Sequence, residues 1–79
     1  MPTLLSINGF RFFVYSNENN EPAHVHVLKG NSYGKIWLEP EIEIVYLEGF
    51  NSHEVKKIQE LVVAHSENFK KKWYEYFSK

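Results

Sequence analysis

An α+β fold, an antiparallel sheet of four to five strands with one long C-terminal helix packed on it, is predicted by this sequence of 79 residues. Short segments in which apolar and polar residues alternate fill the chain as far as Gly49, and turn-forming residues separate them. From residue 52 to residue 77 no Gly or Pro occurs, and apolar residues recur every three or four positions, as in a helix. We therefore expect a single domain, 1–79, with a sheet part at 1–49 and a helical part at 50–79.

The first element predicted is a β-hairpin. Thr3–Ile7 has the composition of a short strand, and Phe10–Ser16 has that of the returning strand. Asn8-Gly9 between them favours a type I′ turn, because such a turn needs positive φ at both central residues. A polar loop of turn-forming residues then extends to Pro22.

Three further strands are expected, at about residues 23–29, 33–39 and 41–47. The first holds the run Ala23-His24-Val25-His26-Val27, and Pro40 separates the second from the third because proline has no N–H to donate to a ladder. A long antiparallel sheet of this kind can leave one face to solvent.

The helix is expected to begin after Asn51 or Ser52, with Glu54 placed as in a capping box. At 26 residues it would be about 39 Å long, more than a small sheet is expected to cover. We therefore expect its aromatic end to serve a protein partner or a homodimer. The residues of this predicted interface are Phe69, Trp73, Tyr76 and Phe77.

Composition excludes several classes of protein. The chain has no cysteine, so it has no disulfide and no thiolate metal site. Its formal net charge of −1 is not that of a domain with a broad nucleic-acid surface. No apolar run approaches the roughly 20 residues of a membrane helix, and no signal peptide is visible. We expect a cytoplasmic protein without membrane association.

The period of two in the strands divides their side chains between two faces. The face expected to form the core consists of Phe12, Val14, Val25, Val27, Ile36 and Leu38. The opposite face is expected to collect aromatic and ionisable residues, namely Arg11, Phe13, Tyr15, His24, His26, Lys35, Trp37 and Glu39.

Two imidazoles on one strand face suggest acid–base chemistry. Histidine titrates near neutral pH, so His24 and His26 are candidates for general base and general acid, with Arg11 as the cation that steadies a phosphorane. Together they would form a metal-independent ribonuclease acting on RNA through its own 2′-OH. The residues predicted to bind the substrate are Tyr15 and Trp37 by stacking, Lys35 by its charge and Glu39 by orienting a histidine.

Two other interpretations of the histidines stay open. A His-x-His pair on a strand aims two imidazoles the same way, as in a metal site, but two ligands do not make one, and we expect neither a metal nor another cofactor. Alternatively, His24 and His26 are structural, half-exposed residues of the sheet. His53 is expected on the exposed first turn of the helix and His65 on its core side.

Five segments together resemble a family of small bacterial proteins, domain of unknown function 4160. They are Gly9–Glu18, Pro22–Val27, Lys35–Pro40, Gly49–Ser52 and Trp73–Phe77. The resemblance covers nearly the whole chain. Members usually have a second proline where Ala23 stands, and residues 41–45 differ slightly from the pattern.

The resemblance implies a genomic context and no catalytic mechanism. Such proteins are often encoded beside a small protein of another family, numbered 2442, and the pair resembles a type II toxin–antitoxin module with this chain as the toxin. The leading hypothesis is thus a toxin-like component, with the paired histidines as a ribonuclease site. The alternative is a non-enzymatic protein-binding module in complex with the product of the neighbouring gene.

Overall fold

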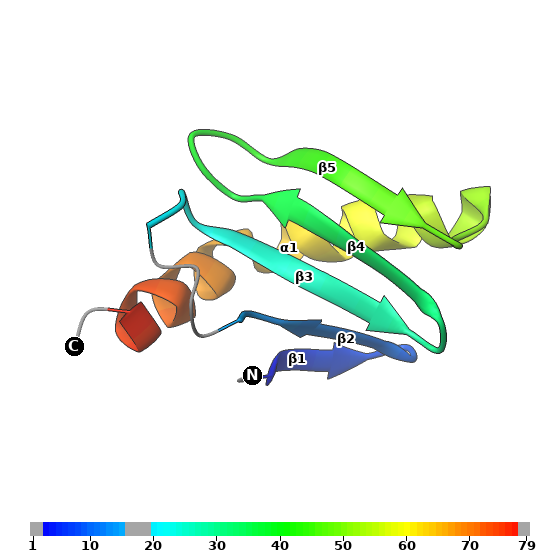
Figure 1. Ribbon diagram of the computed structural model, residues 1–79, viewed down its shortest axis with the longest axis horizontal. Helices are drawn as coiled ribbons and strands as arrows, with labels where there is room; N and C mark the ends of the chain where they lie inside the picture. The colour runs from blue at the N-terminus through cyan, green and yellow to red at the C-terminus, as the bar shows by residue number, and fades with distance from the viewer. Residues whose placement is uncertain (1–2, 16–19, 78–79) are drawn as a thin grey trace.

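The computed structural model describes residues 3–15 and 20–77, which form a five-stranded sheet and one helix (Figure 1). The strand order is β1-β2-β3-β4-β5, and every neighbouring pair is antiparallel. The predicted α+β fold is confirmed. The elements are β1 Thr3–Ile7, β2 Phe10–Phe13, β3 His24–Lys29, β4 Ser32–Trp37, β5 Glu43–Glu48 and α1 Ser52–Phe77.

The first hairpin turns as predicted. Asn8 and Gly9 have φ of 54° and 82°, the left-handed values that a type I′ turn requires at both central positions. Strand β2 is shorter than expected, because pairing ends at Phe13, and the predicted end at Ser16 lies outside the described residues. The turn fixes the register in which Ile7 pairs with Phe10.

Strands β4 and β5 depart from the prediction at their ends. β4 ends at Trp37, two residues before the expected Glu39, and β5 runs from Glu43 to Glu48 instead of starting at Glu41. Proline at position 40 cannot donate to a ladder, so the pairing opens around it. The register between the two strands also shifts between Lys35 and Ile36, which leaves Val45 as an extra residue in β5.

The helix begins with a complete capping box. The amide of Glu54 donates to Oδ1 of Asn51 at 2.8 Å, and the amide of Asn51 donates to Oε1 of Glu54 at 3.1 Å. Lys29 at the end of β3 adds an ion pair to the other oxygen of Glu54 at 3.0 Å. The predicted start and end of the helix, residues 52 and 77, are confirmed.

Acid is expected to weaken this helix start. The Asn51 amide and the Lys29 ammonium lower the pKa of Glu54 below its usual value. A carboxyl whose pKa is lower in the folded than in the unfolded chain adds stability that is present at neutral pH and is lost as the pH falls through the folded-state value. Urea unfolding followed from pH 7 to pH 3 should therefore show less of this acid loss in Glu54→Gln than in the native chain. An identical pH dependence in the two proteins would contradict the expectation.

The helix crosses one face of the sheet, and its C-terminal turns, coloured orange to red, reach past the ends of the strands (Figure 1). Its expected length of about 39 Å matches the longest dimension of the molecule, 37 Å. Phe69 packs against Phe12 of β2 with ring centroids 5.2 Å apart, and the ammonium of Lys72 donates to the carbonyl of Leu4 in β1 at 2.9 Å. The helix is therefore anchored to the sheet as far as Lys72, while its last turn lies past the ends of the strands in Figure 1, in line with the expectation that a small sheet does not cover all of it.

The core lies between α1 and the sheet face that the alternation predicted. All six residues expected there are buried: Phe12, Val14, Val25, Val27, Ile36 and Leu38. Ile58, Val62 and Phe69 oppose them from the helix. Among the described residues, no helix is long and apolar enough to cross a membrane.

Candidate functional site

The pairing of the central strands brings the predicted site residues onto the face opposite the helix. Phe13 of β2 pairs with His26 of β3, and His26 pairs with Lys35 of β4. His24 pairs with Trp37. Because paired residues in adjacent strands point to the same side, the predicted grouping on one face is confirmed for the residues within the strands. Glu39, which was also expected there, lies beyond the end of β4 and is not part of it.

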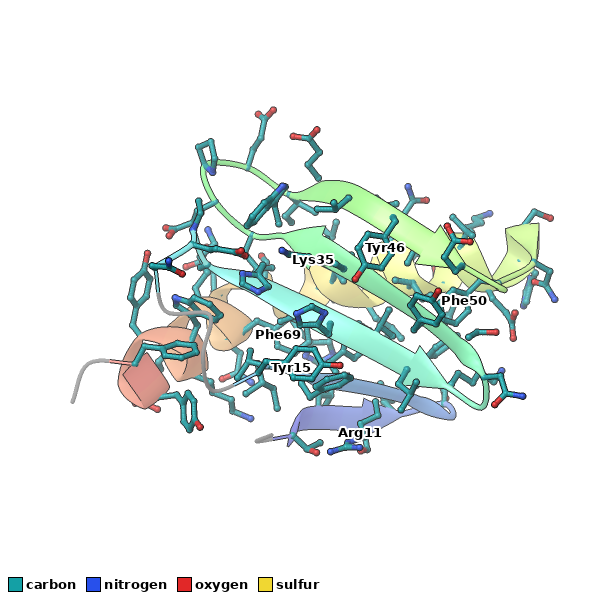
Figure 2. All side chains as sticks on the ribbon, in the orientation of Figure 1. Arg11, Tyr15, Lys35, Tyr46, Phe50 and Phe69 are labelled. Carbon is teal, nitrogen blue, oxygen red and sulfur yellow. The ribbon has the colours of Figure 1, made fainter. Side chains whose placement is uncertain are left out.

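We call this side of the sheet the outer face. Its members, from the pairing of all five strands and the ring contacts of Tyr15, are Thr3, Ser6, Arg11, Phe13, Tyr15, His24, His26, Leu28, Tyr33, Lys35, Trp37, Glu43, Tyr46 and Glu48. Figure 2 shows the labelled Tyr15, Lys35 and Tyr46 on this side, and Arg11 beside β1.

His24 is buried, with no exposed surface. Its Nδ1 lies 2.9 Å from the carbonyl oxygen of Pro22, and because a carbonyl only accepts, Nδ1 carries the proton. Nε2 lies 3.8 Å from a carboxylate oxygen of Glu21. The ring also packs against Trp73 of the helix at 4.7 Å and Trp37 at 5.4 Å. Both nitrogens of His24 are thus directed at groups of the chain itself.

His26 is the more accessible histidine, although only 6% of it is exposed. Its ring stacks on Phe13 at 5.6 Å and meets the edge of Tyr15 at 4.6 Å. The centroids of the two imidazoles are 5.2 Å apart. Tyr15 is exposed and forms the surface above this cluster.

Glu21 links His24 to Lys35, and the sequence patterns did not single it out. Its Oε1 accepts from the Lys35 ammonium at 2.9 Å, and the same oxygen is the one near His24. Lys35 also lies 4.6 Å from the ring centre of Trp37 as a cation–π contact. The sequence feature that could have identified Glu21 as a neighbour of His24 is its position three residues earlier. It lies in a loop, however, and the sequence does not determine the path of that loop.

Arg11 and Glu39 each contact groups other than the histidines. The guanidinium of Arg11 donates to Oγ1 of Thr3 at 2.8 Å and lies over the ring of Phe13. Glu39 accepts a hydrogen bond from the hydroxyl of Tyr74, which raises the pKa of that tyrosine. The carboxylate that the structure places beside His24 is therefore Glu21.

The residues predicted to bind a partner are mostly internal. Phe69 and Trp73 are buried in the core cluster, and Tyr76 and Phe77 are half-buried against it. Phe77 contacts the rings of both Trp73 and Tyr76, at 4.2 and 4.8 Å. Phe69 and Trp73 thus belong to the core of the chain itself, while the half-buried Tyr76 and Phe77 leave part of the predicted interface at the surface.

The chemistry open to the site follows from these contacts. General acid–base catalysis by two histidines needs a nitrogen of each within reach of the substrate, and both nitrogens of His24 face the chain. Within residues 3–15 and 20–77, no group of three or more His, Asp or Glu is placed to hold a metal ion. The arrangement is a packed aromatic and imidazole cluster whose rim, at Tyr15, Lys35 and Trp37, reaches the surface.

An open cleft of about 450 Å³ lies at the other end of β3 and contains none of the predicted site residues. Lys29 and Glu54 in its lining form an ion pair, so two of its charges already neutralise each other. Its lining consists of Asn8, Phe10, Lys29, His53, Glu54, Lys57 and Glu60.

The fold and the cluster define a small α+β domain with a paired-histidine strand at the centre of its sheet. Residues 9–74 match the family model described as Domain of unknown function (DUF4160). The chain belongs to this family, as its motifs indicated. Comparisons with curated proteins and with solved structures found no match.

Proposed function

We propose that this chain is a protein-binding module, the toxin-like component of a two-protein module, and that its partner docks on the outer face. The observation that carries the proposal is the contrast between the two sides of the sheet: α1 covers one, while exposed tyrosines lie on the other. Exposed aromatic residues on a rigid sheet are typical anchors of protein interfaces.

Charge favours a protein over a nucleic acid as the ligand of the outer face. Its cations are Arg11 and Lys35, and its carboxylates are Glu43 and Glu48. Lys35 is in addition neutralised by Glu21. Nucleic-acid binding depends on a surplus of cations that contact phosphates. On this face the carboxylates balance the cations, so there is no such surplus.

The proposal is tested with the small protein encoded by the neighbouring gene. Tyr15→Ala should weaken the complex at least tenfold in a titration of the purified proteins, because truncation of an interfacial tyrosine often costs about 2 kcal/mol. The matched control is Val63→Ala, since Val63 is 62% exposed on the helix, away from the sheet. Equal losses in the two variants, or no complex with the native chain, would overturn the proposal.

Ribonuclease activity is a second candidate, favoured by the two imidazoles 5.2 Å apart and by Lys35 paired across from His26. Only His26 has surface through which it would act on a substrate, as a base or an acid. Cleavage of single-stranded RNA in the presence of a chelator, lost in a folded His26→Gln variant, is the result that this candidate requires. Intact RNA with the native chain removes it.

A further inference from the structure

Strand β5 is an edge of the sheet. Within the described part of the chain its neighbour is β4, and the strand order ends there. The backbone N–H and C=O groups on its other side therefore face outward, as a template on which another extended chain can pair. Figure 1 shows β5 on the margin of the sheet opposite β1.

The side chains of this edge are partly apolar and exposed. Ile42, Val45 and Tyr46 are all exposed large apolar residues, and they lie within five positions of one another. Tyr46 is on the outer face and meets Tyr33 with ring centroids 6.1 Å apart. An edge strand that only avoids pairing is expected to be short, charged or bulged. β5 has a bulge at Val45, but it also offers apolar contact area beside its free backbone.

The charge of the same segment has one sign. Residues 39–48 contain four glutamates and no lysine, arginine or histidine. Glu43 and Glu48 are exposed, and the pairing with β4 puts both on the outer face, on either side of Tyr46. Glu39 already accepts a hydrogen bond from Tyr74. Residues 39–48 contain no cation of their own that could pair with Glu43 or Glu48.

We propose that β5 receives an extended, basic segment of the protein partner as a sixth strand. Main-chain hydrogen bonds to β5 would hold the segment, apolar residues would contact Val45 and Tyr46, and lysines or arginines on the outer face would pair with Glu43 and Glu48. This inference rests on the proposed function, because it names the chemistry by which the same partner reaches the outer face.

The structure disfavours two other arrangements. A second copy pairing antiparallel along β5 would bring Glu43 of one chain near Glu48 of the other, and like charges opposite each other are unfavourable. At the other edge of the sheet, the ammonium of Lys72 already bonds the carbonyl of Leu4 in β1. A basic segment paired with the β5 edge is therefore the arrangement that the charges and the free backbone favour.

The probe for this proposal is a synthetic octapeptide of alternating Lys and Val, titrated into the isotope-labelled full chain. The amide signals of residues 43–48 should shift, and their exchange with solvent should slow. A Glu/Val peptide of the same length should leave them unchanged. The Lys/Val peptide N-methylated at its four central residues should also fail, since it lacks the N–H groups of a pairing strand.

The variant Glu43→Gln with Glu48→Gln should bind the Lys/Val peptide roughly fivefold more weakly, as expected for the loss of two exposed ion pairs. Val63→Ala, on the exposed side of the helix, should bind it like the native chain. Shifts outside β5, equal binding of the acidic peptide, or unchanged affinity in the double variant would each overturn the inference. The proposed function would still stand if Tyr15→Ala weakened the complex with the neighbouring-gene protein.

Discussion

Replacing Phe69 by alanine is expected to unfold much of the protein. The side chain is fully buried between α1 and the sheet, where its ring packs at a tilt against Phe12 of β2 and against His65 one helical turn earlier. Truncating a buried phenylalanine costs about 3–5 kcal/mol, through lost burial and the cavity left behind. At about 0.05–0.15 kcal/mol per residue, a domain of this size has only about 4–12 kcal/mol of stability in total.

Urea unfolding followed by circular dichroism measures the effect. The midpoint for Phe69→Ala should fall sharply, or the variant should be largely unfolded without denaturant. Val63→Ala on the same helix is the control, and it should unfold like the native chain because Val63 is mostly exposed. A partner interface at the helix end predicts the opposite result for Phe69→Ala, namely a stable chain that loses only its partner. A normal midpoint for Phe69→Ala would thus restore that interpretation.

The local patterns of the sequence were sufficient to predict the framework. The turn at Asn8-Gly9, the capping box of Asn51 with Glu54, and the alternation in β3 each depend on residues close together in the chain. Because alternation assigns every strand residue to a side, it also predicted that His24 and His26 share a face with Lys35. These features need no knowledge of how distant segments meet.

Contacts between distant segments explain what the sequence did not reveal. The period of a strand says which side a histidine is on, but not what covers it. Trp73, 49 positions after His24, reaches the end of the sheet and closes over that ring. The loop residue Glu21 takes the place expected for Glu39, which instead binds the helix through Tyr74. A helix stripe likewise indicates an apolar surface without saying whether a sheet or a partner covers it.

Replacing His24 by alanine is expected to lower the free energy of unfolding by about 2–4 kcal/mol, as for other large buried side chains. The change removes a fully buried ring that contacts both Trp73 and Trp37, and it leaves the carbonyl of Pro22 without its Nδ1–H donor. His24→Phe retains a ring of similar size but no donor. It should cost less than His24→Ala, about 0.5–1.5 kcal/mol, because only the hydrogen bond to the Pro22 carbonyl is lost.

Variants of His24 and His26 also distinguish a catalytic role of the two histidines from a structural one. A His24→Ala chain that loses its function is uninformative about catalysis, because loss of folding has the same effect. His26→Gln is the sharper change, since His26 reaches the surface beside Tyr15 and should alter stability less than His24→Ala. Calorimetry on the three variants gives the order of their melting temperatures. If His24→Ala melted like the native chain, the buried position of His24 would be wrong, and a catalytic role for both imidazoles would again be open.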